Sequence, residues 1–373
     1  MAGPMTWMIS SDSHIVEPPG LFVERIDRAY RDHAPRVVEA DGADWWLVDG
    51  EVAFSASASA RAGDRFESQE GLQAKFRFDV VRPGAYQPDA WIDDNEADGV
   101  WGGVLYPSLG LVFFSIADGG LLTAVCRVWN DWVAEFAGAH PDRLKGVAMI
   151  NLDDVDEAVA EMTRARARGI VGAAIPVAPP PDRPYRSQEY DRFWAAAQDL
   201  GIPLSLHIAT NRTPGEWKQL FLDSVAATPD MWVRHSLADM IMSGVFERFP
   251  RLTVGSIEHE AGWAPFFVRR LDYMYTQMER SPDAHRFAGG ALPSDFFHRN
   301  VFVSFQEDDV GVRERDIIGV DGLMWGNDYP HTESTFPRSR AIIADRLRGV
   351  PDDEKLKLLL INVARVYGFG EPA

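Results

Sequence analysis

The chain opens with an apolar run that is followed at once by a carboxylate and an imidazole: Trp7-Met8-Ile9-Ser10-Ser11-Asp12-Ser13-His14. Trp7 to Ser11 predicts a β-strand, and residues two apart on an extended chain point to the same side. Asp12 and His14 can therefore bind one cation together. We expect a metal site to begin at the end of this strand.

Three further groups of the same kind end predicted strands later in the chain. His207 closes Pro203-Leu204-Ser205-Leu206, His259 follows a run that begins at Leu252, and Asp328 closes Leu323-Met324-Trp325-Gly326. A single histidine at a strand end is usually structural, satisfied by a backbone partner or exposed to solvent. Five His and Asp groups at equivalent positions point instead to a shared site.

Short β-rich runs alternate with helical patterns along nearly the whole chain. The predicted strands are 7–11, 103–106, 144–150, 172–175, 204–207, 252–257, 301–305 and 323–325, and the main predicted helices are 121–139, 155–168, 188–200, 231–248, 264–278 and 353–367. Repeated strand–helix units with apolar strands favour a parallel sheet, and eight of them favour a closed barrel. We predict an α/β fold, a (β/α)8 TIM barrel, in one domain over residues 1–373.

The connection after the first strand is far longer than an ordinary βα loop. We treat residues 28–98 as an insertion that forms either a cap over the barrel mouth or an oligomer contact, since loops after barrel strands lie on that face. A disordered linker is the alternative, but the aromatic content argues for burial. The aromatic residues concerned are Trp45, Trp46, Phe54, Phe66, Phe76, Phe78 and Trp91.

Composition limits the classes of partner. The 373 residues carry 37 Lys and Arg against 56 Asp and Glu, and the resulting net charge of −19 disfavours binding to nucleic acid or to anionic membranes. No run is apolar enough to span a bilayer, and we expect a cytoplasmic protein. The single cysteine, Cys126, lies in a helical pattern and is interpreted as a core residue.

Imidazole and carboxylate donors together suit a borderline or hard divalent ion and leave positions for water or substrate. We expect one such ion, zinc in the first place, with manganese or iron as alternatives. An open site of this kind indicates catalysis on a small-molecule substrate.

The order and spacing of several motifs resemble the amidohydrolase superfamily, in particular its branch of metal-dependent decarboxylases related to aminocarboxymuconate semialdehyde decarboxylase and γ-resorcylate decarboxylase. The motifs are Asp12-Ser13-His14 with Glu17-Pro18-Pro19, Asp98-Gly99-Val100 before Leu105-Tyr106-Pro107-Ser108, Leu206-His207, Gly244-Val245-Phe246-Glu247-Arg248-Phe249-Pro250, His259-Glu260-Ala261-Gly262-Trp263 and Gly326-Asn327-Asp328-Tyr329-Pro330-His331.

The resemblance implies that Asp12, His14, His207 and Asp328 bind one metal and that His259 and Asp328 act in catalysis. Relatives often have His or Glu where this chain has Asp12, whose shorter side chain implies weaker or water-mediated binding. The fourth strand ends in Ala173-Ala174-Ile175-Pro176 and offers no lysine to bridge two metals. A mononuclear site is therefore expected.

Three further polar residues lie close to the predicted ligands in sequence. Glu17 either caps a loop or contacts substrate, and Glu260 either supports His259 or contacts substrate. For His331, contact with the substrate and a supporting role remain equally open.

Two reactions fit the same residues. The resemblance favours decarboxylation of a small aromatic or unsaturated carboxylic acid, and the alternative is hydrolysis of an amide, ester or lactone. A barrel that binds metal without catalysis is the third possibility. We also expect a homodimer or homotetramer.

Overall fold

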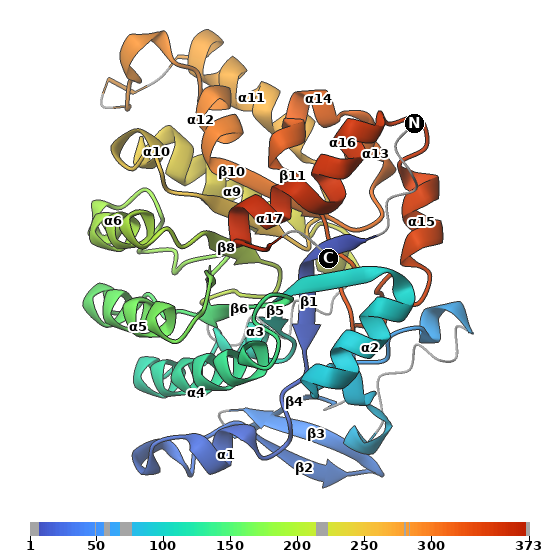
Figure 1. Ribbon diagram of the computed structural model, residues 1–373. Helices are drawn as coiled ribbons and strands as arrows, with labels where there is room; N and C mark the ends of the chain where they lie inside the picture. The colour runs from blue at the N-terminus through green and yellow to red at the C-terminus, as the bar shows by residue number, and fades with distance from the viewer. Residues whose placement is uncertain are drawn as a thin grey trace.

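The computed structural model describes residues 7–48, 50–55, 60–67, 77–213, 223–279, 281–282 and 284–370. Eight parallel strands form a nearly closed barrel in which each strand pairs with the next one in the sequence. They are β1 (Met8–Ile15), β5 (Val100–Pro107), β6 (Leu144–Met149), β7 (Gly172–Ile175), β8 (Leu204–His207), β9 (Val254–Ile257), β10 (Val301–Phe305) and β11 (Leu323–Trp325). Figure 1 shows them at the centre with the helices outside. The predicted α/β barrel is confirmed.

Polar contacts bring the last strand next to the first. The Ser11 hydroxyl donates to the carbonyl of Trp325 at 2.9 Å, and the Asp328 N–H donates to the carbonyl of Asp12 at 2.9 Å. The first strand is also longer than predicted, because β1 continues to Ile15 beyond an irregularity between Ser10 and Ser13. Asp12 therefore lies beside Asp328 at the carboxyl end of the barrel.

Helices cover the barrel, and most of them lie where the sequence predicts a helix. They include α4 (Gly119–Gly138), α5 (Val155–Ala167), α6 (Asp191–Leu200), α9 (Asp230–Met242), α10 (Val245–Arg248), α11 (Ala264–Gln277), α12 (Pro293–Asn300) and α15 (Ser339–Arg346). Of these, α12 and α15 were not predicted. Short helices α1 (Leu21–Arg25), α3 (Gly110–Phe113), α8 (Asp223–Ala226), α13 (Asp309–Arg313) and α14 (Arg315–Ile318) lie in the connections. The single helix predicted over 231–248 is instead two, since Gly244 adopts a left-handed φ of 77° between them.

The C-terminal helix closes the amino end of the barrel. It runs through α16 (Asp352–Leu356), a π-helical turn at Lys357–Ile361 and α17 (Asn362–Tyr367). Tyr367 packs with interior residues such as Val104, Phe302 and Met324, and its hydroxyl lies 2.9 Å from that of Tyr106. Side chains thus fill the interior, and the active sites of such barrels lie at the opposite, carboxyl end.

The insertion after β1 contains a small antiparallel sheet that the sequence pattern did not predict. Its strands are β2 (Arg36–Ala40), β3 (Ala43–Val48) and β4 (Glu51–Ser55), and helix α2 (Pro88–Asp98) leads back into the barrel. Trp46 is fully buried, with its ring 5.9 Å from those of Phe22 and Phe113. Phe76 and the side chain of Phe54 lie outside the described part of the chain.

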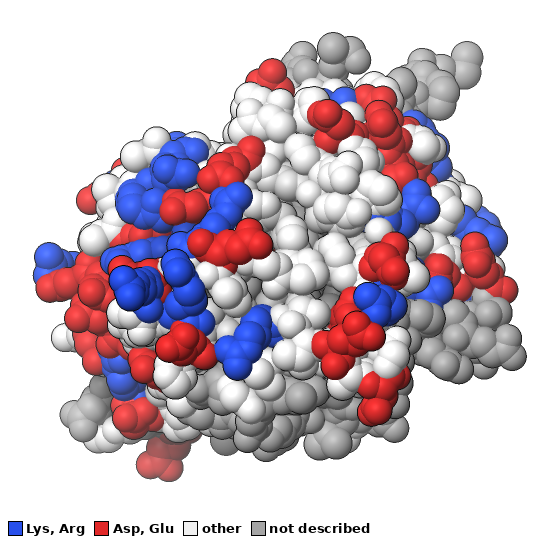
Figure 2. All heavy atoms as spheres, turned by 90° about the horizontal axis from the view of Figure 1, so that it is seen from below, with Lys and Arg blue, Asp and Glu red and all other residues white. Residues whose placement is uncertain are grey.

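Part of the insertion reaches the loops at the carboxyl end of the strands. Arg65 forms an ion pair with Glu307 and donates from Nε to the carbonyl of Ser334 at 2.9 Å. In Figure 1 the β1 arrow points toward the small sheet. Figure 2, seen from that side, shows acidic and basic side chains interspersed around a neutral middle area. Among the described residues no helix has the length and apolar character needed to cross a membrane.

Candidate metal centre

The structure brings the four predicted metal ligands together at the carboxyl end of the barrel. Asp12 and His14 come from β1, His207 ends β8, and Asp328 follows β11. The Nε2 atom of His14 lies 3.3 Å from Oδ1 of both Asp12 and Asp328, and the Nε2 atom of His207 lies 3.4 Å from Oδ1 of Asp12. Four side chains from three strands thus point their donor atoms at one region.

Backbone carbonyls fix the orientation of both imidazoles. Nδ1 of His14 lies 2.9 Å from the carbonyl of Pro107, and Nδ1 of His207 lies 3.1 Å from the carbonyl of Ile208. A carbonyl only accepts, so each Nδ1 must carry the hydrogen and each Nε2 of a neutral ring keeps its lone pair. Both histidines are therefore held in the form that binds a metal through Nε2.

The facing atoms are buried and make no hydrogen bond. Nε2 of His14 and His207, Oδ1 of Asp12 and both carboxylate oxygens of Asp328 are in this state. Buried polar atoms without a partner are costly, and several of them facing one point fit a bound cation. The residues present therefore fit a divalent metal ion.

The electrostatics of the site favour a positive charge at this point. Burial lowers the pKa of His14, but the facing carboxylates, chiefly Asp12 and Asp328, outweigh burial and raise it well above its ordinary value. Burial raises the pKa of Asp328 to about 6 against the opposing effect of His14. A metal must displace a proton here, so its affinity falls as the pH falls.

The sequence pattern missed one member of this group, Glu258. Its Oε2 atom lies 3.4 Å from Nε2 of His207 and 3.6 Å from Nε2 of His14. Asp12, His14, His207 and Glu258 form one possible metal-binding group, and His14, Glu258, Asp328 and His331 form a second that overlaps it. The signal available in the sequence was a carboxylate directly before His259 at the end of β9.

His259 is buried beside the centre but belongs to neither of these groups. Its Nδ1 lies 3.2 Å from the Ser256 hydroxyl, whereas its Nε2 has no hydrogen-bond partner. Burial, with a smaller effect from His207, lowers the pKa of His259 to about 3. The ring therefore stays neutral near neutral pH and has one nitrogen, Nε2, free to form a hydrogen bond with a ligand.

His331 lies against two of the ligands. Its ring stacks on His14 with 3.9 Å between centroids, and its Nδ1 lies 2.8 Å from Oδ1 of Asp328. Its Nε2 lies 3.1 Å from the Ser108 hydroxyl. Burial, with a smaller effect from His14, lowers the pKa of His331 to about 4. These contacts position Asp328 and His14.

Glu17 and Glu260 both bind backbone N–H groups. The Glu17 carboxylate is fully buried and accepts from Leu109 at 3.0 Å and Gly110 at 2.8 Å. The Glu260 carboxylate accepts from Gln306 at 2.9 Å and Glu307 at 3.2 Å, and burial raises its pKa to about 6. Each carboxylate holds a loop at the mouth of the barrel.

A cavity of about 300 Å³ opens onto the centre, at the lower end of the usual range for ligand pockets. Its lining is acidic, and among its described residues there is no Lys or Arg. The lining residues are Asp12, Ile208, Ala226, Pro229, Glu258, Glu260, Ser304, Phe305, Gln306, Gly326 and Glu333.

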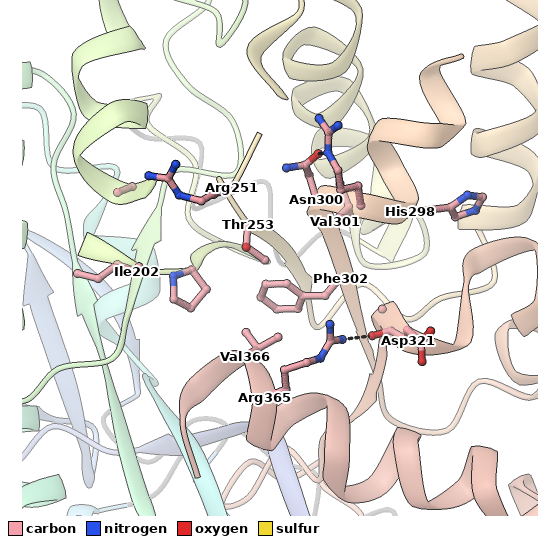
Figure 3. Close-up of a pocket in the computed structure, with 15 residues that line it drawn as sticks. Ile202, Arg251, Thr253, His298, Asn300, Val301, Phe302, Asp321, Arg365 and Val366 are labelled. Atoms are coloured by element: carbon pink, nitrogen blue, oxygen red, sulfur yellow. Dashed lines mark hydrogen bonds between the residues drawn. The ribbon is translucent and has the colours of Figure 1, made fainter. Parts of the chain in front are cut away.

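A second cavity, of about 250 Å³, lies at the amino ends of the strands. In Figure 3 the ring of Phe302 lies between Arg251 on one side and Arg365 on the other. None of the predicted site residues lines this cavity. It is therefore separate from the candidate metal centre.

Comparisons with known proteins agree with the barrel fold. The chain is 24% identical over 254 residues to a γ-resorcylate decarboxylase of Polaromonas sp. (strain JS666 / ATCC BAA-500), which covers 62% of this chain and 75% of the relative. A crystal structure of an amidohydrolase from Mycobacterium avium subsp. paratuberculosis K-10 superposes with a TM-score of 0.80 at 22% identity, covering 98% of this chain and all of the other.

A second crystal structure, a dihydroxybenzoic acid decarboxylase from Polaromonas sp. JS666, contains manganese and the inhibitor 2-nitroresorcinol. It superposes with a TM-score of 0.69 at 16% identity, covering 99% of this chain and 98% of the other. Most decisively, the sequence profile described as Amidohydrolase matches residues 105–369, well over half of the chain. The chain belongs to the amidohydrolase family.

Proposed function

We propose that this protein is a metal-dependent decarboxylase that acts on a small aromatic carboxylic acid. The observation that carries the proposal is the set of buried donor atoms without partners in a chain whose relatives include γ-resorcylate decarboxylase. The donor set indicates metal-dependent chemistry, and the relatives indicate which reaction of the superfamily to test first.

One divalent ion would be held by Asp12, His14, His207 and Asp328. Zinc was the first expectation from the sequence, with manganese and iron as alternatives. The Polaromonas structure contains manganese, and the carboxylate of Glu258 beside the centre adds a hard oxygen donor. Both observations now favour manganese over zinc.

When bound, the ion supplies the positive charge that orients a substrate carboxylate and a neighbouring oxygen. Asp328 would take up a proton and deliver it to the ring carbon that bears the carboxylate, a role favoured by burial, which raises its pKa from 3.8 to about 6. The electrons of the C–C bond then return to the ring as CO2 leaves. His259 would donate a hydrogen bond to the charge that develops on a substrate oxygen.

The test is CO2 release by the manganese-loaded protein from 2,6-dihydroxybenzoate and related hydroxybenzoates, measured beside a panel of amides, esters and lactones. We expect CO2 release that depends on the metal and disappears in His207→Ala. If an amide, ester or lactone is hydrolysed and no CO2 is released, the protein is a hydrolase and the decarboxylase proposal is wrong. A loaded protein inert on both panels would favour a non-catalytic barrel.

Two finer features are proposed with this function. Residues 28–98 belong to the single barrel domain and serve as a cap or an oligomer contact, and in their described part the contacts of Arg65 with Glu307 and Ser334 support the cap. The protein acts in the cytoplasm as a homodimer or homotetramer. Analytical ultracentrifugation tests the oligomeric state, and a monomer would contradict it.

A further inference from the structure

Glu258 occupies an unusual place at the end of β9. Its backbone is left-handed, with a φ of 61°, as are those of Glu260 at 53° and Asp328 at 58°. Residues other than glycine seldom adopt this conformation, and such residues cluster at functional sites. At Glu258 the turn directs Oε2 toward the imidazoles of His14 and His207, where it has no hydrogen-bond partner.

Glu258 and Asp12 line the cavity, whereas the two imidazoles of the donor group do not. The side chains of His14 and His207 are fully buried, whereas that of Glu258 is 19% exposed. A ligand that enters from the cavity therefore meets Glu258 before it reaches either imidazole.

The charge of Glu258 affects how an anionic substrate can approach the metal. Asp12, Asp328 and Glu258 together contribute three negative charges when ionised, which exceed the two positive charges of a divalent ion. An anionic substrate would then approach a centre that is already negative, along a wall that includes Glu260 and Glu333. Replacing one carboxylate by another at the metal leaves the charge of the centre unchanged, whereas adding a further carboxylate does not.

We propose that Glu258 is a direct ligand of the metal in the absence of substrate and that the substrate carboxylate takes its place. The ligand role follows from the donor geometry, and the exchange rests on the proposed decarboxylase function. Before substrate binds, Glu258 would hold the ion together with Asp12, His14 and His207, the three residues with which it forms one possible metal-binding group; Asp328 shares a second group with Glu258 and His14. Departure of Glu258 toward the cavity opens the side from which substrate arrives.

The first test measures Mn²⁺ affinity without any substrate, by electron paramagnetic resonance of free Mn²⁺, for wild type, Glu258→Ala and Glu258→Gln. Glu333→Gln is the matched control, because it removes a carboxylate from the same cavity but from outside the donor group. We expect the Ala variant to bind Mn²⁺ at least about tenfold more weakly and the control to remain close to wild type. Equal affinities for wild type and both Glu258 variants would overturn the ligand role.

The second test measures binding of 2-nitroresorcinol to the manganese-saturated proteins. Exchange predicts tighter binding to Glu258→Ala than to wild type, because no protein ligand then has to leave. Equal tightening in Glu333→Gln would show a general effect of cavity charge and would overturn the exchange. Thermal unfolding of each variant confirms that it is folded.

The two proposals fail in different ways. A wild-type protein that binds Mn²⁺ but releases no CO2 refutes the decarboxylase and with it the exchange, while the affinities still decide the ligand role. Equal Mn²⁺ affinities refute the ligand role even if CO2 is released.

Discussion

Replacing Glu17 by Gln should alter the pH dependence of folding in the metal-free protein. The Glu17 carboxylate is fully buried, and burial raises its pKa from 4.5 to about 7 despite the N–H groups of Leu109 and Gly110. Between these two pH values the folded protein keeps a proton that the unfolded chain has lost. The free energy of unfolding therefore falls as the pH rises from 4.5 to 7.

The size of the effect follows from the same pKa. At about 1.4 kcal/mol per pH unit, the difference between 4.5 and about 7 corresponds to roughly 3 kcal/mol of lost stability above pH 7. Gln cannot ionise, but its amide leaves one of the two N–H donors without an acceptor, which costs about 1–3 kcal/mol at every pH. The variant should be less stable than wild type at pH 5 and equal to it, or up to about 2 kcal/mol more stable, at pH 8.

The assay is urea unfolding of chelator-treated protein at several pH values between 5 and 8. All other titrating groups are common to both proteins, so the difference between them isolates Glu17. Glu24→Gln, which removes an exposed carboxylate of α1, is the control and should follow wild type throughout. A constant difference between Glu17→Gln and wild type across this range would refute the reasoning.

Three further predictions concern the centre and the insertion. His207→Ala should lose the metal but keep the far-ultraviolet circular dichroism spectrum of the barrel, because strand-end side chains add little to the core below them; full metal content with full activity would contradict the ligand assignment. Asp328→Asn should lose nearly all activity even in excess metal, whereas His259→Asn should keep its metal and lose ~10²-fold or more in kcat. Metal content and kcat are measured for both variants. Loss of metal in the His259 variant would mean that His259 is a metal ligand, contrary to the role assigned to it. Trp46→Ala should destabilise the protein by about 3–5 kcal/mol in urea unfolding, because the ring is fully buried against Phe22 and Phe113; a change below about 1 kcal/mol would mean that the insertion is not packed on the barrel.

The barrel was predictable because most of its strands are short apolar runs that alternate with helical patterns along the chain. The runs ending at His207 and Trp325 mark β8 and β11 with the bounds that the structure shows. Parallel strands place these ends on one face, so convergence of the four predicted ligands follows from topology. The small sheet β2–β4 was not predicted, because its strands mix apolar and charged residues without regular alternation.

Glu258 could not be identified from periodicity. Alternation along a strand places neighbouring side chains on opposite faces, so this pattern predicts that a site containing His259 excludes Glu258. The left-handed backbone at Glu258 and Glu260 breaks that alternation after β9. The supporting contact of His331 with Asp328 was likewise hidden, since it depends on the path of the loop that follows β11.

The most direct test of the metal centre is an anomalous difference map from crystals grown with Mn²⁺. We predict one strong peak per chain, within bonding distance of Asp12 Oδ1, His14 Nε2, His207 Nε2 and Asp328 Oδ1. No peak at this position, or a peak held by other residues, would contradict the assignment on which the proposed chemistry depends.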